Sequence, residues 1–378
     1  MNKPEQQFFA LLRCGLWGGL PDKGLFSGAT DWDAILAMAT MQTVRGILFD
    51  AVMELPAGLQ PPAQWMRELH RVVIRIEQSH ELLHRRIAEV VPLLQSAGIR
   101  PVLLKGQGVA RNYPNPLRRQ CGDIDLYVGE EDYEKACRIV DGWGNVSGKE
   151  SESLKHAHFR RNGVVVEVHR IAERLYRPVL DNRFQVWTKK QLSGSTLKVL
   201  NVKGVDIFLP PVNFNVLYIF NHAYHHFLCG GVGLRQLCDW VMYLNAFSTE
   251  IDSCQLETDL KAFGLSRAWR IFGVLAVNEL GLPEEKMPLY SPVHGRQSRK
   301  VLEKILQSGN FGQYASRRMR RPKGYFQGKW HSLIYMHTHL GAIVLLFPKD
   351  VVAYYSYFLY NGVKQVVLDK SGKQYPAW

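Results

Sequence analysis

The run from Cys121 to Val128 (Cys-Gly-Asp-Ile-Asp-Leu-Tyr-Val) constrains the fold and the chemistry of this chain more than any other segment. Its apolar residues alternate with two carboxylates, which is the pattern of a β-strand with one buried face. The alternation predicts that Asp123 and Asp125 share one face while the apolar side chains enter a core on the other. Two neighbouring carboxylates repel each other unless a cation lies between them, so this face predicts a Mg²⁺ site.

A third carboxylate is predicted from the run Val164 to His169 (Val-Val-Val-Glu-Val-His). Glu167 is a charged residue inside an otherwise apolar strand, and burying a carboxylate without a partner is costly. If this strand neighbours the strand of Asp123 and Asp125, the three carboxylates converge on one site. Such a set can hold two divalent ions about 3.5–4 Å apart. His169 shares the face of Glu167, where it either orients a ligand or the acceptor or is hydrogen-bonded within the strand.

The hydrophobic pattern changes period along the chain and thereby predicts an α+β fold. Helical spacing covers most of residues 1–97, alternation begins near residue 99, and helical spacing returns after Pro210-Pro211. We therefore expect a small mixed β-sheet core over 98–210, flanked by an N-terminal helical region (1–97) and a C-terminal helical region (211–378). The predicted helices cover residues 6–17, 32–55, 62–97, 109–113, 130–140, 212–228, 234–246 and 332–367. The predicted strands cover residues 99–104, 122–128, 156–161 and 164–169, the last two joined by the turn pair Asn162-Gly163.

A glycine turn precedes the aspartate strand. Gly106-Gln107-Gly108 leads through a short predicted helix to Asp123-Ile124-Asp125-Leu126. This order resembles the signature of the nucleotidyltransferase superfamily that includes DNA polymerase β, although the turn is one residue looser than the usual Gly-Gly or Gly-Ser pair. Glycines allow backbone amides to approach a phosphate, aided by the N-terminus of the following helix, so Gly106 and Gly108 are predicted to bind nucleotide.

Several short motifs carry a narrower resemblance. They are Leu104-Lys105-Gly106, Tyr113-Pro114, Arg119, Asp123-Ile124-Asp125-Leu126, Glu167-Val168-His169, Asn221-His222 and Leu234-Arg235-Gln236-Leu237-Cys238-Asp239. On these motifs the chain resembles a bacterial family of uncharacterised nucleotidyltransferases over most of residues 30–250. The resemblance implies that Asp123, Asp125 and Glu167 are the catalytic metal ligands. It also implies that Lys105 and Arg119 lie near the triphosphate, which agrees with the bidentate fork that Arg offers to phosphate; a solvated lysine at a strand end is the alternative for Lys105.

The charge of the chain favours anionic partners. Its 378 residues carry a net charge of +13, which suits nucleotides, nucleic acid or an acidic membrane surface. Basic and aromatic residues interleave over residues 317–330, as they do in single-strand nucleic-acid sites and also on solvated loops. The six cysteines include no Cys-x-x-Cys pair, and neither a signal peptide nor a stretch long enough to span a membrane is evident. We therefore expect a reduced, cytoplasmic protein.

A group of potential metal ligands lies on the helix predicted over residues 212–228 and just after it. His222, His225, His226 and Cys229 have spacings that could place two or three of them on one face. The rest of the helix is apolar, which favours packed or hydrogen-bonded histidines over a zinc site. Among them, His222 is the residue expected to contact the substrate.

Together these patterns predict an enzyme that moves a nucleoside monophosphate from an NTP, such as ATP, to an acceptor hydroxyl. It would use two Mg²⁺ ions, or Mn²⁺ in their place. The acceptor, whether RNA, protein or a small molecule, is left open. Two alternatives remain: a non-catalytic nucleotide- or RNA-binding module on the same fold, and a metal-dependent glycosyltransferase. The second usually has several βα units before its Asp-x-Asp, whereas about a hundred largely helical residues precede it here.

Overall fold

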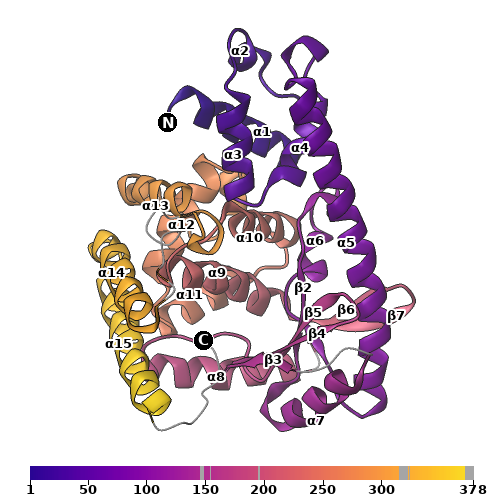
Figure 1. The fold of residues 1–378 in the computed structure, drawn as a ribbon, viewed down its shortest axis with the longest axis vertical. Helices are drawn as coiled ribbons and strands as arrows, with labels where there is room; N and C mark the ends of the chain where they lie inside the picture. Colours follow the sequence, from indigo (N-terminus) through magenta and orange to yellow (C-terminus); the bar gives the residue numbers. More distant parts are fainter. Residues whose placement is uncertain (145–148, 154, 195, 315–321, 323, 371–378) are drawn as a thin grey trace. The chain divides into compact units, whose positions relative to one another are not determined.

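The computed structural model describes residues 1–378 apart from 145–148, 154, 195, 315–321, 323 and 371–378 (Figure 1). The chain divides into two compact units, each assembled from segments that are distant in sequence. We call them the helical unit (Met1–Glu77, Ala110–Gln120 and Ile219–Val351) and the sheet unit (Gln78–Val109, Cys121–Tyr218 and Val352–Trp378). The sequence predicted three regions that are each continuous in the chain, with boundaries near residues 97 and 210. Each of the two units instead combines segments from all three of these regions.

The sheet unit contains a mixed β-sheet, which has seven strands in the part of the chain that the structure describes. Its strand order is β3-β4-β5-β2-β1-β7-β6. β2 is parallel to β5 and β1 is parallel to β7, while the remaining neighbours are antiparallel. The predicted α+β class and the mixed sheet are therefore confirmed. The strands are β1 (Val102–Leu103), β2 (Asp123–Tyr127), β3 (Lys149–Glu152), β4 (His156–Arg161), β5 (Val164–His169), β6 (Lys198–Val202) and β7 (Val205–Leu209).

One face of this sheet is apolar, and helix α7 (Gly129–Gly142) packs on it (Figure 1). The inward side chains of β2 and β5 on this face are completely buried: Ile124, Leu126, Val166 and Val168. Arg161 of β4 lies on the same face and donates from Nε to the carbonyl oxygen of Val140 in α7. Because side chains alternate along a strand, the carboxylates of β2 must point to the opposite face.

The helical unit is built around buried aromatic rings. The ring centroid of Phe220 lies 5.1 Å from that of Trp240, 5.0 Å from that of Trp269 and 5.8 Å from that of Phe272. All four side chains are buried. None of the described helices is both long enough and apolar enough to cross a membrane. The helices of this unit are α1 (Lys3–Trp17), α2 (Lys23–Phe26), α3 (Trp32–Met41), α4 (Arg45–Met53), α10 (Leu234–Phe247), α11 (Ser253–Ala262), α12 (Ser266–Asn278), α13 (Gly295–Ser308) and α14 (Tyr325–Ile343).

Four further helices, α5 (Ala63–Ser96), α6 (Gln107–Ala110), α9 (Val212–Leu228) and α15 (Pro348–Lys370), contribute residues to both units. Within the sheet unit, α5 is tied to the sheet by two hydrogen bonds. Arg86 donates from Nε to the carbonyl oxygen of Asn162, and Gln95 donates from Nε2 to that of Asp206. Helix α8 (Pro178–Ser193) lies wholly within this unit.

Some predicted elements are wrong in their extent. The single helix expected over 32–55 is two helices, α3 and α4, because Thr43 between them adopts a φ of +59°, which a helix cannot include. The single helix expected over 332–367 is likewise divided into α14 and α15, and Pro348 is the first residue of α15. The strand expected over 99–104 is only two residues long. Helix α8 and strands β3, β6 and β7 were not predicted.

A close approach between α1 and α4 requires a glycine in the last turn of α1. A Cβ added at Gly15 would lie 2.8 Å from the carbonyl carbon of Ile47 and 2.9 Å from its Cγ2. We expect Gly15→Ala to destabilise the helical unit by about 1–3 kcal/mol, because backbone atoms cannot make room for a methyl group. Gly341, inside α14, has no atom within 4 Å of such a Cβ. Gly341→Ala should therefore stabilise by up to about 1 kcal/mol through helix propensity. Urea unfolding of both variants measures the two effects, and equal signs would contradict the assignment.

Candidate functional site

The face of the sheet opposite α7 is polar over three adjacent strands, β4, β5 and β2. In the strand register His158 pairs with Glu167, which pairs with Asp125, so these three form one row across the sheet. His156, His169 and Tyr127 form the next row. Paired residues of adjacent strands share a face. The strands of Asp125 and Glu167 are neighbours, which is the condition under which the sequence predicted that the carboxylates converge, and these two carboxylates stand directly opposite each other.

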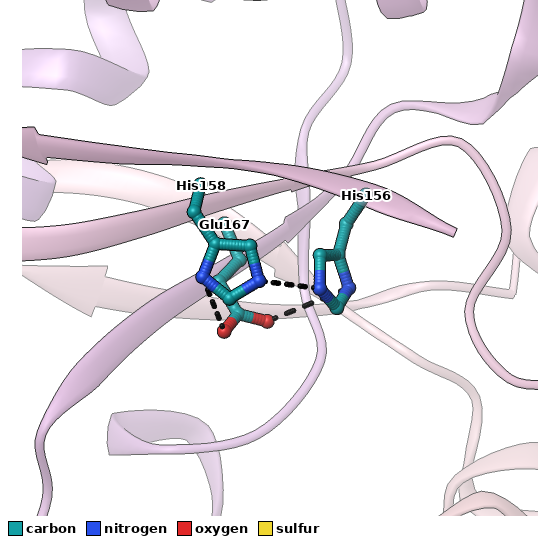
Figure 2. Close-up of side chains that lie close together, drawn as sticks. All are labelled: His156, His158 and Glu167. Atoms are coloured by element: carbon teal, nitrogen blue, oxygen red, sulfur yellow. Dashed lines mark hydrogen bonds and ion pairs between the residues drawn. The ribbon is translucent and has the colours of Figure 1, made fainter. Parts of the chain in front are cut away.

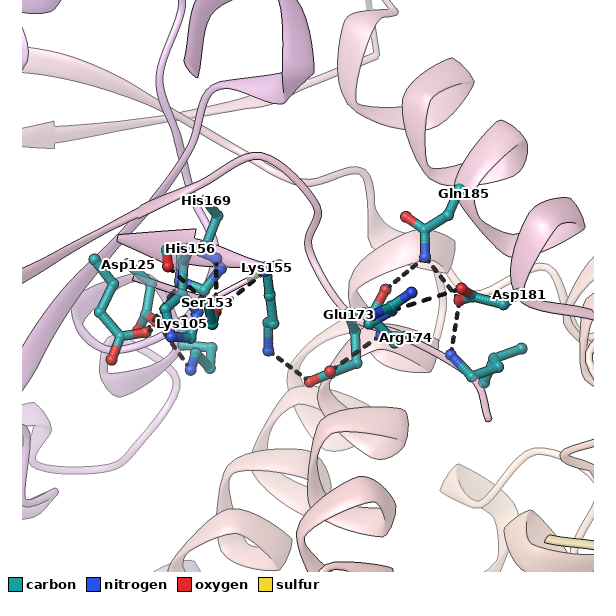
Figure 3. A network of polar contacts seen from close by, with 12 residues as sticks. Lys105, Asp125, Ser153, Lys155, His156, His169, Glu173, Arg174, Asp181 and Gln185 are labelled. Carbon is teal, nitrogen blue, oxygen red and sulfur yellow. Dashed lines mark hydrogen bonds and ion pairs between the residues drawn. The ribbon is translucent and has the colours of Figure 1, made fainter. Parts of the chain in front are cut away.

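His169 joins these two carboxylates. Its Nε2 lies 3.1 Å from Oδ1 of Asp125 and 3.1 Å from Oε2 of Glu167, and its side chain is fully buried (Figure 3). Carboxylate oxygens only accept hydrogen bonds when ionised, so this nitrogen carries a proton. Burial lowers the pKa of His169, but the hydrogen bonds and charges of the two carboxylates outweigh it and raise the pKa above its usual value.

Lys105 also pairs with Asp125. Its Nζ lies 3.0 Å from Oδ1 of the aspartate, and its side chain is only 18% exposed (Figure 3). Burial alone would lower the pKa of Lys105, but the charges of Asp125, Asp123 and Glu167 raise it well above the usual value. Lys105 is therefore a charged, largely buried member of the cluster. The alternative of a solvated lysine at a strand end does not describe it.

Both carboxylates are ionised in this environment. Burial opposes the charge of Asp125, yet Lys105 and His169 hold its pKa well below the usual range. For Glu167, burial and the charge of Asp125 raise the pKa, but His169 and Lys105 overcome them and lower it to about 2. The second oxygen of Asp125, Oδ2, is buried and has no hydrogen-bond partner among the described residues. An ionised, buried oxygen without a donor is an available ligand for a cation.

The donor set fits a divalent cation in part. Ligand atoms of Asp125, Glu167 and His169 lie within 4.8 Å of one another, and carboxylate oxygens are the ligands that Mg²⁺ takes in proteins. Asp123 is half-buried on the same strand, two residues before Asp125, and its charge acts on Lys105. In the described residues it is not a member of a compact ligand group. The structure therefore brings Asp125 and Glu167 together and leaves Asp123 farther away.

The glycine turn lies beside the aspartate strand. Gly106 has a φ of +60°, and a Cβ there would lie 3.5 Å from the backbone oxygen of Asp123. A turn of this conformation favours glycine. At Gly108 a Cβ would lie 2.9 Å from Cδ2 of Leu209 in β7, so close packing of α6 on the sheet explains the second glycine.

Two predicted site residues, Arg119 and His222, lie in the helical unit. Arg119 is buried and donates from Nε to Oδ1 of Asp239 at 2.9 Å and from Nη2 to Oδ2 at 2.6 Å. Tyr113 donates from its hydroxyl to Oδ1 of the same aspartate at 2.7 Å. Three of the motifs that carry the family resemblance thus meet in one buried cluster. The ring of His222 contacts that of His226 one turn later in α9, with centroids 4.5 Å apart.

Two histidines of β4 belong to the polar face and were not predicted as site residues. His156 and His158 point toward Glu167 and toward each other (Figure 2). Burial and the charge of His169 lower the pKa of His156 to about 2, so its imidazole is neutral. The sequence did hold a signal for them. A two-residue turn at Asn162-Gly163 pairs Arg161 with Val164, and counting back along both strands places His158 opposite Glu167.

A buried ion pair, which was also not predicted, joins the residue before β4 to the segment after β5. Nζ of Lys155 lies 3.0 Å from Oε2 of Glu173, whose side chain is completely buried (Figure 3). Asp181, at the start of α8, accepts hydrogen bonds from the backbone N–H of Leu175 and from Nε2 of Gln185, both at 2.9 Å. These contacts fix the segment that leads from β5 to α8.

The basic and aromatic segment at 317–330 is only partly described. Five of its six cationic residues lie outside the described residues: Arg317, Arg318, Arg320, Arg321 and Lys323. Trp330, near the start of α14, is 65% exposed. The suggestion that this segment binds nucleic acid therefore stays a prediction.

The lowered pKa of Glu167 predicts a loss of stability in acid. A group whose pKa is lower in the folded chain stabilises the fold above its unfolded-state pKa, and this contribution disappears as the pH falls through the folded-state value. The stability difference between the wild type and Glu167→Gln should therefore shrink as the pH falls from about 4.5 toward about 2. Urea unfolding across this range measures it, with Glu134→Gln in α7, whose side chain is 72% exposed, as control. A difference that does not change with pH would contradict the folded-state pKa.

Comparison with models of protein families finds a match. The family model described as uncharacterised nucleotidyltransferase matches residues 28–280, which is two thirds of the chain. This range contains Lys105, Asp123, Asp125 and Glu167 as well as the cluster of Arg119 and Asp239. Comparison with curated proteins finds no match, and comparison with solved structures finds none either.

Proposed function

We propose that this protein, which belongs to the family of uncharacterised nucleotidyltransferases, transfers a nucleoside monophosphate from an NTP to an acceptor hydroxyl. The family supports nucleotide transfer in general; the two-metal mechanism and the hydroxyl acceptor are our proposal. The observation that carries it is the pair Asp125 and Glu167, opposite each other on adjacent strands, both ionised, with Oδ2 of Asp125 buried and without a hydrogen-bond donor in the described chain. We infer an ancestry shared with the DNA polymerase β superfamily from the glycine turn and the aspartate strand.

In this proposal Asp125, Glu167 and Asp123 hold two Mg²⁺ or Mn²⁺ ions. Bound there, such ions would neutralise the triphosphate and make the acceptor hydroxyl easier to deprotonate. His169 keeps the two facing carboxylates at a fixed separation through Nε2. Because Asp123 lies outside the compact group in the described residues, it would have to turn its carboxylate toward Asp125 when the ions bind.

Lys105 would bind the triphosphate. The ammonium group of Lys105 forms an ion pair with Asp125. A metal ion bound to the carboxylates would take the place of this ammonium group, which could then bind a phosphate oxygen. The backbone of Gly106, beside Asp123, would lie along the same phosphates. Arg119 is proposed to bind the triphosphate with a guanidinium held in plane by Asp239, and His169 and His222 to contact the substrate.

One observation favours a second candidate, a nucleotide-binding module without catalysis. Lys105 and His169 already place two positive charges beside Asp125 and Glu167, so the carboxylates are balanced without a metal ion. A protein of that kind would bind an NTP through Lys105 and would leave its phosphates intact.

A labelled-nucleotide assay separates the two candidates. The full chain is incubated with Mg²⁺ or Mn²⁺ and each α-labelled NTP, alone and with total RNA, a protein extract or a small-molecule fraction. Transfer of label with release of pyrophosphate supports the enzyme. Metal-independent NTP binding without pyrophosphate release supports the binding module. Absence of both binding and release under every condition would refute the proposed function.

A further inference from the structure

The polar face continues beyond the proposed Mg²⁺ carboxylates onto strand β4. His156 and His158 are two residues apart on this strand, so their side chains emerge on the same face. The antiparallel register places His158 opposite Glu167. Two imidazoles and one carboxylate thus meet at one position of the sheet, on backbone that is fixed by strand pairing (Figure 2).

The ligand atoms of these three side chains converge. Nε2 of His156 and Nε2 of His158 are 2.6 Å apart, Nδ1 of His158 is 3.5 Å from Oε1 of Glu167, and Nδ1 of His156 is 3.7 Å from Oε2. Ligand atoms from all three residues lie within 4.8 Å of one another. In addition, Nδ1 of His156 is buried and makes no hydrogen bond to the described residues.

We propose that His156, His158 and Glu167 form a second metal site, specific for a divalent transition-metal ion such as Zn²⁺. Two histidines and one carboxylate, with a further position left for water, are a common ligand set for such ions. Imidazole nitrogen suits Zn²⁺ and Co²⁺ well, whereas Mg²⁺ prefers an all-oxygen shell. This site shares Glu167 with the proposed Mg²⁺ site and differs from it in its two nitrogen ligands.

The position of the group allows an ion to enter and to be held. The side chain of His158 is 31% exposed, while those of His156 and Glu167 are 17% and 13% exposed. An ion can thus reach the site past His158 and is then largely shielded from water. Bonds of about 2.0–2.1 Å to both histidines at a tetrahedral angle require their nitrogens to separate from the present 2.6 Å to about 3.3 Å. Rotation of the partly exposed His158 ring would provide that movement.

The test uses the full chain without a polyhistidine tag, freed of metal by a chelator. Zn²⁺ affinity is measured by competition with a chromogenic chelator, and Co²⁺ is added separately so that its absorption spectrum reports nitrogen and oxygen or thiolate ligands. We expect one ion per chain at this site, retained in excess Mg²⁺. His158→Gln should weaken Zn²⁺ binding by more than the roughly 10–100-fold that loss of an outer-shell partner causes.

Three controls make the result decisive. His80→Gln combined with His84→Gln removes another neighbouring pair of the sheet unit, on α5, with ring centroids 6.0 Å apart, and should leave the affinity unchanged. Asp123→Asn should also leave it unchanged, because Asp123 is outside the group. If His158→Gln is poorly folded by circular dichroism, His158→Asp, which keeps a ligand oxygen, is compared with His156→Gln, and only the second should lose Zn²⁺.

Several results would overturn the proposal. One is unchanged Zn²⁺ affinity in both His158→Gln and His156→Gln. Another is an equal loss in the His80 and His84 variant, and a third is a thiolate spectrum with Co²⁺. Since the readout is metal binding alone, failure of this site leaves the proposed nucleotidyl transfer untouched. Absence of nucleotidyl transfer would likewise leave this site untouched.

Discussion

Asp125→Asn is expected to reduce nucleotidyl transfer by roughly 1000-fold or more, because a metal-bound carboxylate contributes several kcal/mol of transition-state stabilisation. The change is nearly isosteric, so it removes the charge of a side chain that is 1% exposed while it keeps its volume. The rate of pyrophosphate release at saturating NTP measures the effect. The half-buried Asp132→Asn in α7 of the same unit is the matched control and should keep the wild-type rate.

Loss of activity through misfolding must be distinguished from loss of catalysis. Asp125→Asn leaves the charges of Lys105 and His169 with one carboxylate fewer, so it is also expected to lower the stability of the sheet unit. The variant is therefore assayed at a temperature where circular dichroism shows it folded, and its NTP binding is measured in parallel. A folded Asp125→Asn that transfers nucleotide at the wild-type rate would contradict the role of Asp125 as a metal ligand.

Asp123→Asn tests the remaining carboxylate in the same assay. If Asp123 completes the metal site, its loss should approach that of Asp125→Asn. A small effect would restrict the catalytic carboxylates to Asp125 and Glu167, the two that the structure brings together. The comparison of the rates of Asp123→Asn and Asp125→Asn therefore decides whether the site uses two metal ions or one.

The candidate site could be predicted from sequence to the extent that it depends on strand alternation. Every second residue of these two strands is apolar and buried, namely Ile124, Leu126, Val166 and Val168. This pattern alone predicts that the side chains of Asp125 and Glu167 point away from the core. That β2 and β5 are adjacent and parallel could not be read from the residues, because strand order depends on pairing between segments that are distant in sequence.

The parts that were missed depend on tertiary packing or on one unusual backbone angle. A threonine does not predict a positive φ, and the apolar spacing continues through Thr43, so the break between α3 and α4 could not be predicted from the sequence. Gly108 was predicted to face a phosphate, and its packing against Leu209 depends on β7, a strand that was not predicted. His156 and His158 differ from these, because the hairpin turn alone sets the register that places them beside Glu167.

A second large effect is expected in the helical unit, where Asp239→Asn should destabilise the fold by about 3–5 kcal/mol. Arg119 and Asp239 are both almost fully buried, and the aspartate accepts two hydrogen bonds from the arginine and one from Tyr113. The amide removes the negative charge and leaves the arginine charge buried without its partner. Urea unfolding followed by near-ultraviolet circular dichroism measures the loss. Glu131→Gln, which breaks an exposed ion pair with Lys189, is the control and should leave the midpoint unchanged.

A paired substitution separates a structural from a substrate-binding role of Arg119. Arg119→Met with Asp239→Leu replaces the buried ion pair by apolar side chains, which often restores most of the stability that either single change removes. If Arg119 only supports the fold, the double variant should recover both stability and nucleotidyl transfer. If Arg119 also binds the triphosphate, stability should recover while the KM for NTP stays raised. Recovery of both would remove Arg119 from the proposed triphosphate site and leave Lys105 as the cation that binds the phosphates.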